Sequence, residues 1–140
     1  MPVKILALLF LTTAYAVVRY NVFGGVSLEN IPTYVLNKSI SMSAVVALCI
    51  SSVQHFRGRA DGGRVWGKVT WHLVVVHIVL SLAVLTKAYF PKFFAEEKMN
   101  LAGELTILLG AAAAYLFWLL RKKSWEWPQR RGLLLLAAVL

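Results

Sequence analysis

Residues 69–86 read VTWHLVVVHIVLSLAVLT, a run of 18 residues without a Lys, Arg, Asp or Glu. A helix needs about 20 predominantly apolar residues to cross the hydrocarbon core of a bilayer. The run reaches that length once its flanking residues are included. It therefore predicts a transmembrane helix over about residues 66–88.

Three other segments share this character. They are Ile5–Val18, the uncharged run Ser39–Phe56, and Leu101–Leu120, which only Glu104 interrupts. With their flanks they predict helices over about 2–22, 32–56 and 101–121, since Lys4 can extend toward the headgroups and Pro32 suits a first helical turn. The expected fold is all-α: a polytopic membrane helix bundle with four transmembrane helices in a single domain, 1–140.

A fifth apolar segment, Gly132–Leu140, has nine residues and is too short to cross a bilayer as a helix. Two interpretations stay open for this tail over 132–140. It lies at the membrane interface or packs on a partner, or it begins a segment that continues in a longer chain.

The composition excludes several classes of protein. Apolar residues make up 59% of the 140 residues and charged residues 15%, whereas soluble domains carry about 25% charged residues. Mean hydropathy is +0.69. These values argue against a disordered chain, a nucleic-acid-binding domain and most soluble enzymes.

The 15 Lys and Arg residues against six acids predict an orientation rather than a nucleic-acid partner. Basic residues collect in the cytoplasmic loops of membrane proteins and meet anionic lipid there. With the N-terminus inside, ten of the 15 are cytoplasmic: Lys4, Arg57, Arg59, Arg64, Lys68, Arg121, Lys122, Lys123, Arg130 and Arg131. We therefore expect an integral membrane protein with a cytoplasmic N-terminus.

Ionisable residues inside a membrane are costly and so indicate where function lies. His77 falls near the middle of the third run, His72 lies closer to its inner end, and His55 ends the second run. His77 has two interpretations: a neutral histidine bonded to a neighbouring helix, or an axial ligand of haem iron. His72 and His77 diverge by about 140° on a helix and cannot share one metal.

Arg64-Val-Trp-Gly67, with His77 ten residues after the glycine, resembles a motif of the ferric-reductase-like transmembrane domain family, in particular its bacterial haem-binding subunits of the YedZ/MsrQ type. In that family a basic, glycine-rich loop leads through R-x-x-G into a helix that carries a haem-ligating histidine. The resemblance covers about residues 36–120. It implies a bacterial cytoplasmic membrane protein with a b-type haem held by His77, and with Arg64 or Arg57 offsetting the propionates.

The resemblance breaks at the opposing ligand. The family takes it from a later W-x-x-L-H segment, but Trp127-Pro-Gln-Arg-Arg131-Gly-Leu has no histidine, and none follows His77. The second ligand would be His55, His72, a residue of another chain, or a residue of a C-terminal extension. No flavin- or nicotinamide-binding motif is present, so an electron donor would be another protein.

Three functions compete on this evidence. The first is a b-type haem electron-transfer subunit, and the second is a non-catalytic accessory subunit of a larger membrane complex, whose partners would pack on the small residues Gly110, Ala111 and Ala114. The third is a small transporter using Glu104. Lys38 and Glu104 both fall in outer halves of predicted helices and could form a structural pair. No complete catalytic site is visible.

Overall fold

The computed structural model describes residues 2–121, and these divide into two compact units, one up to Val84 and one from Leu85. The sequence predicts one domain. Within the described residues four helices are long and apolar enough to cross a membrane. The expected fold class, all-α with four transmembrane helices, is confirmed, and the chain is an integral membrane protein. The apolar tail and the Trp127–Arg131 segment lie outside the described residues.

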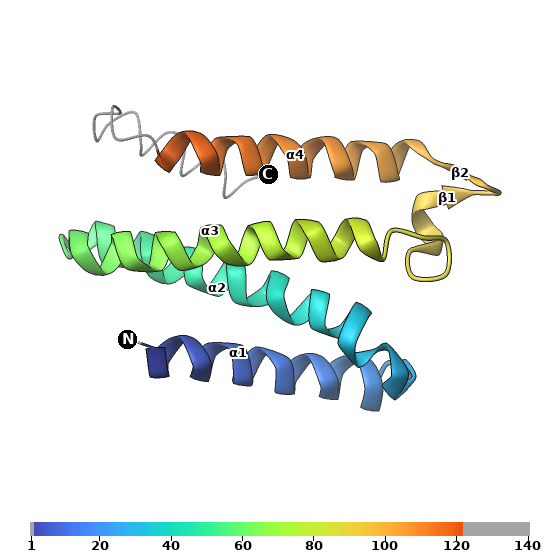
Figure 1. Ribbon diagram of the computed structural model, residues 1–140, viewed down its shortest axis with the longest axis horizontal. Helices are drawn as coiled ribbons and strands as arrows, with labels where there is room; N and C mark the ends of the chain where they lie inside the picture. Colours follow the sequence, from blue (N-terminus) through green and yellow to red (C-terminus); the bar gives the residue numbers. More distant parts are fainter. Residues whose placement is uncertain (1, 122–140) are drawn as a thin grey trace. The chain divides into compact units, whose positions relative to one another are not determined.

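The first unit begins with α1, Pro2–Val17, which continues as a π-helical turn, Val18–Val22. Asn21 closes the following bend by donating from Nδ2 to the carbonyl oxygens of Val26 at 2.8 Å and Ser27 at 3.2 Å. The chain then returns through a 3₁₀ turn, Leu28–Asn30, and a π-helical turn, Ile31–Val35, into α2, Leu36–Phe56. Figure 1 shows these segments in blue to cyan.

The third helix, α3, spans Ala60–Ala83, so the expected range of 66–88 is wrong at both ends. Gly58 has φ +72°, and Gly58 N and Arg59 N donate to the carbonyls of His55 at 3.1 Å and Gln54 at 2.9 Å. These two bonds form a Schellman motif, in which a glycine takes the left-handed conformation. Because this turn completes the reversal within a few residues, Gly62 and Gly63 are free to be helical.

Two glycines let α2 and α3 approach closely. A Cβ on Gly63 would lie 2.6 Å from the His55 ring, and one on Gly67 would lie 3.4 Å from Ser51 Oγ. Ser51 Oγ also donates to the Gly63 carbonyl at 2.8 Å. Small residues at such positions are typical of membrane helix pairs, where close contact replaces a hydrophobic driving force.

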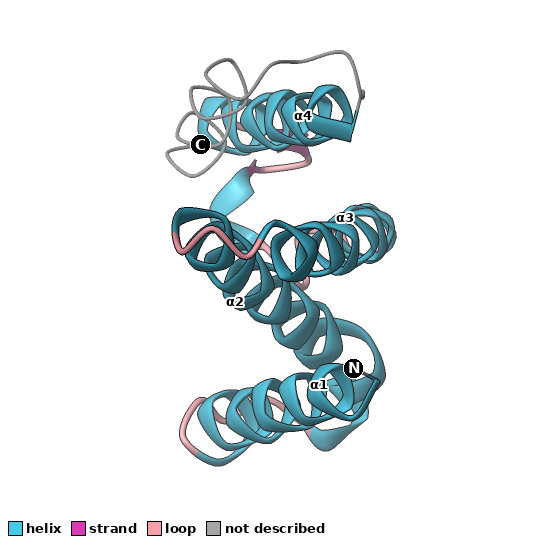
Figure 2. Cartoon of the chain, turned by 90° about the vertical axis from the view of Figure 1, so that its left-hand side faces the viewer, coloured by secondary structure: helices cyan, strands magenta, loops and turns pink. Residues whose placement is uncertain are grey.

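Hydroxyl groups join α1 to α2. Thr12 Oγ1 lies 2.6 Å from Ser43 Oγ, and Thr13 Oγ1 lies 2.8 Å from Ser39 Oγ. Thr12, Ser39 and Ser43 are each less than 5% exposed. Figure 2 shows α2 between α1 and α3. The contact between α1 and α2 therefore contains a cluster of buried hydroxyl side chains.

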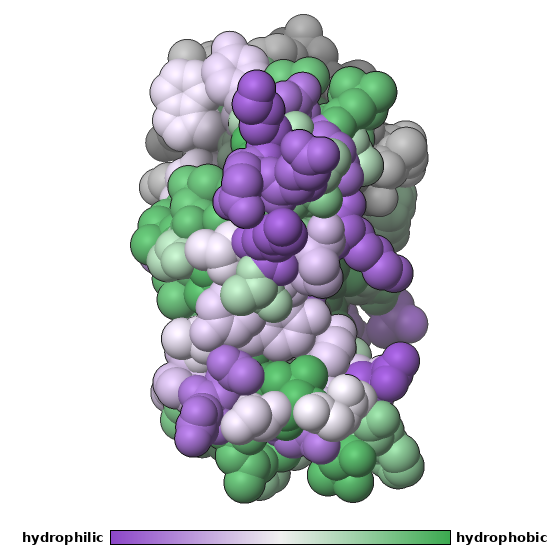
Figure 3. All heavy atoms as spheres, turned by 90° about the vertical axis from the view of Figure 1, so that its right-hand side faces the viewer, coloured by the Kyte–Doolittle hydropathy of each residue, from purple (hydrophilic) through white to green (hydrophobic). Residues whose placement is uncertain are grey.

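The second unit contains a 3₁₀ turn, Pro91–Phe93, a two-residue antiparallel hairpin of β1, Phe94–Ala95, and β2, Lys98–Met99, and then α4, Leu101–Arg121. Figure 3 shows hydrophilic side chains gathered at the end of the molecule that carries this hairpin. A Cβ on Gly103 would lie 2.6 Å from Met99 Cγ and 2.8 Å from the Phe93 carbonyl oxygen. The absence of a side chain at Gly103 therefore allows the start of α4 to pack closely against Met99 and Phe93.

Candidate functional site

His77 belongs to a polar cluster between α2 and α3. Its Nδ1 lies 2.7 Å from Asn37 Oδ1, and Asn37 Nδ2 donates to Ser81 Oγ at 3.1 Å. Asn37 is 1% exposed, whereas His77 and Ser81 are half-buried. All three residues lie within helices long enough to span the membrane. Such a cluster is expected only where each polar group finds a partner, because water is absent from the hydrocarbon core.

The contact with Asn37 assigns the imidazole proton. An amide oxygen only accepts, so a hydrogen bond at 2.7 Å places the proton of a neutral ring on Nδ1. The lone pair is then on Nε2. This is the arrangement of a metal-ligating histidine, whose second ring nitrogen donates to a fixed acceptor.

Ser81 does not occupy the Nε2 direction. Its Oγ is 3.4 Å from Nδ1 and 3.5 Å from Nε2 of His77. A group aligned with one nitrogen's lone pair is much closer to that nitrogen than to the other. The near-equal distances therefore place Ser81 beside the ring, out of line with the Nε2 lone pair.

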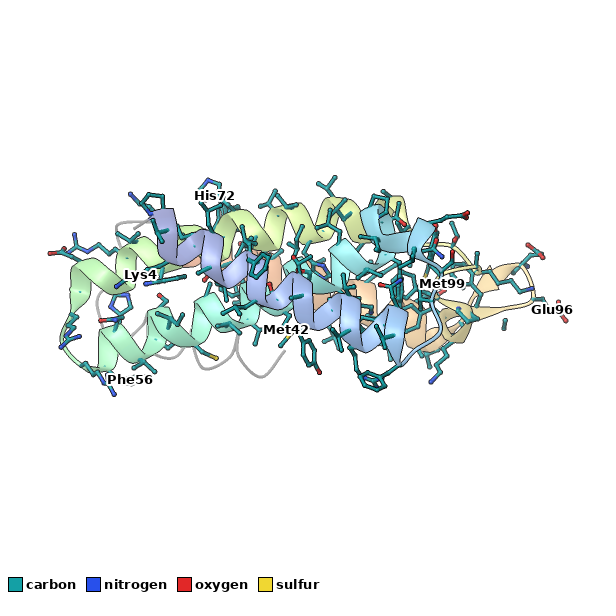
Figure 4. The ribbon with its side chains drawn as sticks, turned by 90° about the horizontal axis from the view of Figure 1, so that it is seen from below. Lys4, Met42, Phe56, His72, Glu96 and Met99 are labelled. Atoms are coloured by element: carbon teal, nitrogen blue, oxygen red, sulfur yellow. The ribbon has the colours of Figure 1, made fainter. Side chains whose placement is uncertain are left out.

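The other two histidines lie elsewhere. The His55 ring packs against Gly63, and Gly63 is about 21 Å along α3 from His77. His72 is exposed, and its Nδ1 lies 2.7 Å from the carbonyl oxygen of Lys68 in its own helix. Figure 4 shows His72 pointing away from the other helices of its unit. The structure therefore brings neither His55 nor His72 to His77, and a part for either of them as a second ligand stays a prediction.

The predicted loop cation Arg64 lies near His55 rather than near His77. It is exposed in the first part of α3, and its Nη1 lies 3.9 Å from Asp61 Oδ1. Gly67, the second position of the motif, faces Ser51 of α2. In the structure these motif residues belong to the turn and the helix contact at this end of the unit, with Arg64 about 20 Å and Gly67 about 15 Å along α3 from His77.

The predicted pair Lys38–Glu104 involves residues of two different units and stays a prediction. Lys38 is half-buried on α2, and its Nζ lies 5.3 Å from the centre of the Tyr34 ring. This is within the range of a cation–π contact. Glu104 is exposed in the first turn of α4, where a carboxylate is favoured by the helix dipole.

Sequence reasoning missed Asn37 and Ser81 as partners of His77. The available signal was the presence of an amide and a hydroxyl inside otherwise apolar segments, since such groups need partners there. Their pairing across two helices depends on the register of α2 against α3, which the periodicity of either segment alone does not define.

Comparison of the chain with protein-family models, with curated proteins and with solved structures finds no match. Among the described residues, no group of three or more His, Cys, Asp or Glu side chains is placed to hold a metal ion. Residues 2–121 supply two imidazoles with a fixed Nδ1 partner, His72 on the Lys68 carbonyl of its own helix and His77 on Asn37 of the neighbouring helix. A haem iron would be held by Nε2 of such an imidazole.

Proposed function

We propose that this integral membrane protein holds a b-type haem through Nε2 of His77 and acts as an electron-transfer subunit. The observation that carries the proposal is the 2.7 Å contact between His77 Nδ1 and Asn37 Oδ1. It orients the ring and leaves the Nε2 lone pair for a ligand. The resemblance of Arg64, Gly67 and His77 to the ferric-reductase-like motif points to the same histidine.

The roles of the chain's own residues follow from the cluster. His77 would hold the iron through Nε2, Asn37 would hold the imidazole in its tautomer, and Ser81 would fix the Asn37 amide through the bond at 3.1 Å. A bound b-type haem would supply one-electron transfer at its iron. Electrons would come from a partner protein.

The proposal includes a setting in the cell. The distribution of Lys and Arg favours an N-terminus in the cytoplasm, and the resemblance to bacterial haem-binding subunits favours a bacterial cytoplasmic membrane. The end of the first unit with the turn between α2 and α3 would then be cytoplasmic. His77 would lie closer to the opposite face, since it is near the C-terminal end of α3.

One observation favours the second function, an accessory subunit without a cofactor. His77, Asn37 and Ser81 already give one another hydrogen-bond partners, so the cluster has a structural use that requires no ligand. The transporter function has no comparable support, because Glu104 lies in the exposed first turn of α4 rather than at a midplane.

Titration of the detergent-purified chain with haemin separates these functions. We expect wild-type protein to develop a saturable Soret band at one haem per chain, and His77→Ala to lose it. His72→Ala is the matched control, because His72 is exposed and bonds only its own helix, and it should titrate like wild type. A His77→Ala protein that is equally helical by circular dichroism and still saturates at one haem would refute the proposal.

A further inference from the structure

The first unit carries a concentration of positive charge at one end. Arg57 and Arg59 flank the Gly58 turn, and Arg64 and Lys68 follow on the first turns of α3. Lys4, near the start of α1, lies at the same end of the unit. Figure 4 shows Lys4 and Phe56 toward this end. All five side chains are exposed. We call them the basic end of the first unit.

The geometry of the turn holds the cations together. The Schellman bonds at Gly58 fix the backbone of Arg57 and Arg59, and residues four apart on a helix, such as Arg64 and Lys68, share a face. His72 continues this row one turn further along and is also exposed. The row therefore runs from the turn along the first three turns of α3.

Negative charge at this end is small. Asp61 is the one acid of the first unit near the turn, and its side chain is 99% exposed at 3.9 Å from Arg64. An ion pair so exposed contributes little and leaves the guanidinium available. The opposite end of the same unit carries Arg19, Glu29 and the half-buried Lys38, and so has no comparable excess of positive charge.

The position of these cations at the membrane surface indicates that lipid headgroups are their partner. Phe56 ends α2 and Ala60 begins α3, so Arg57 and Arg59 lie where two spanning helices leave the hydrocarbon. Half-buried Trp71 lies on the adjoining part of α3. Aromatic rings and cations at this depth meet lipid headgroups.

We propose that the basic end of the first unit binds the phosphate groups of anionic phospholipids, with Arg57, Arg59, Arg64 and Lys68 as the contacts. The site is distinct from the His77 cluster and does not depend on a haem. Lipid phosphates carry negative charge at the membrane surface, where these four side chains emerge. Attraction to this charge explains why the cations collect at the turn.

Native mass spectrometry of the full chain from micelles with equal amounts of phosphatidylglycerol and phosphatidylcholine tests the site. Wild type should retain phosphatidylglycerol preferentially. The triple variant Arg57→Gln, Arg59→Gln, Lys68→Gln should lose about fivefold in this preference for each cation removed. The control triple, Lys87→Gln, Lys92→Gln, Lys98→Gln in the second unit, should keep it.

Two arms on the wild-type protein keep the test decisive even where the triple variant folds poorly. The preference should fall in high salt, because exposed charges are screened, and millimolar inorganic phosphate should leave it intact. Equal retention of the two lipids by wild type would overturn the proposal. So would an equal loss in the control triple, or displacement by free phosphate.

Discussion

Asn37 fixes the orientation and the tautomer of His77. It faces α3 from α2, and its amide bonds both His77 and Ser81. Interhelical hydrogen bonds of this kind contribute about 0.6–2 kcal/mol each in membrane proteins. The amide thus both holds α2 to α3 and selects the tautomer of the imidazole.

Replacement of Asn37 separates orientation from packing. Asn37→Leu keeps the approximate volume but removes the acceptor for Nδ1, so we expect weaker haemin binding, a shifted Soret maximum and a loss of about 1 kcal/mol in unfolding free energy. Asn37→Asp retains an acceptor oxygen and should bind haemin nearly as well as wild type. Absorption spectra of the haemin titrations measure both. Equal affinity and equal spectra in the leucine variant would show that Asn37 does not position His77.

At the scale of helix pairs, the two glycines of α3 make a matched test of the α2–α3 contact. Gly63→Ala places a methyl group 2.6 Å from the His55 ring, whereas Gly67→Ala places one at 3.4 Å from Ser51 Oγ. We expect Gly63→Ala to cost about 1–3 kcal/mol, as overpacked contacts do, and Gly67→Ala to cost less. Thermal unfolding in detergent followed by circular dichroism measures the order, and the reverse order would contradict this packing.

The α1–α2 contact has its own test. Thr12→Val keeps the shape of the side chain but removes the hydroxyl that lies 2.6 Å from Ser43 Oγ. The expected loss is about 1 kcal/mol. Thr106→Val is the control, because exposed Thr106 bonds only the Ala102 carbonyl of its own helix. In mixed micelles, Thr12→Val should therefore lower the unfolding midpoint, whereas Thr106→Val should not. Equal midpoints for the two variants would refute the contribution of this hydroxyl cluster.

The elements themselves were largely predictable, because uncharged runs of membrane-spanning length have few alternatives to a helix. The start of α3 was not predictable from the sequence. Asp61, Gly62 and Gly63 predict a turn by composition, but the Schellman motif at Gly58 completes the reversal before them. The partners of His77 were also missed, because the register between α2 and α3 is set by close contacts at Gly63 and Gly67, which no single segment reveals.

At the scale of the whole molecule, charge predicts orientation. In a background with Cys49→Ala, Ser27→Cys marks the connection between α1 and α2, and Arg59→Cys marks the turn between α2 and α3; both positions are exposed. With the N-terminus inside, a membrane-impermeant maleimide should label Ser27→Cys in intact host cells and reach Arg59→Cys only after lysis. The opposite labelling pattern would reverse the orientation.

The central claim is that His77 binds haem, and an absorption spectrum of the purified protein tests it most directly. The spectrum is recorded oxidised and then reduced with dithionite, with haem quantified as the pyridine haemochrome. The account predicts a Soret band, reduced α and β bands, and haem in stoichiometric proportion to the chain. A flat spectrum from helical, folded protein produced in haem-supplemented cells would contradict it and leave His77 as a structural partner of Asn37.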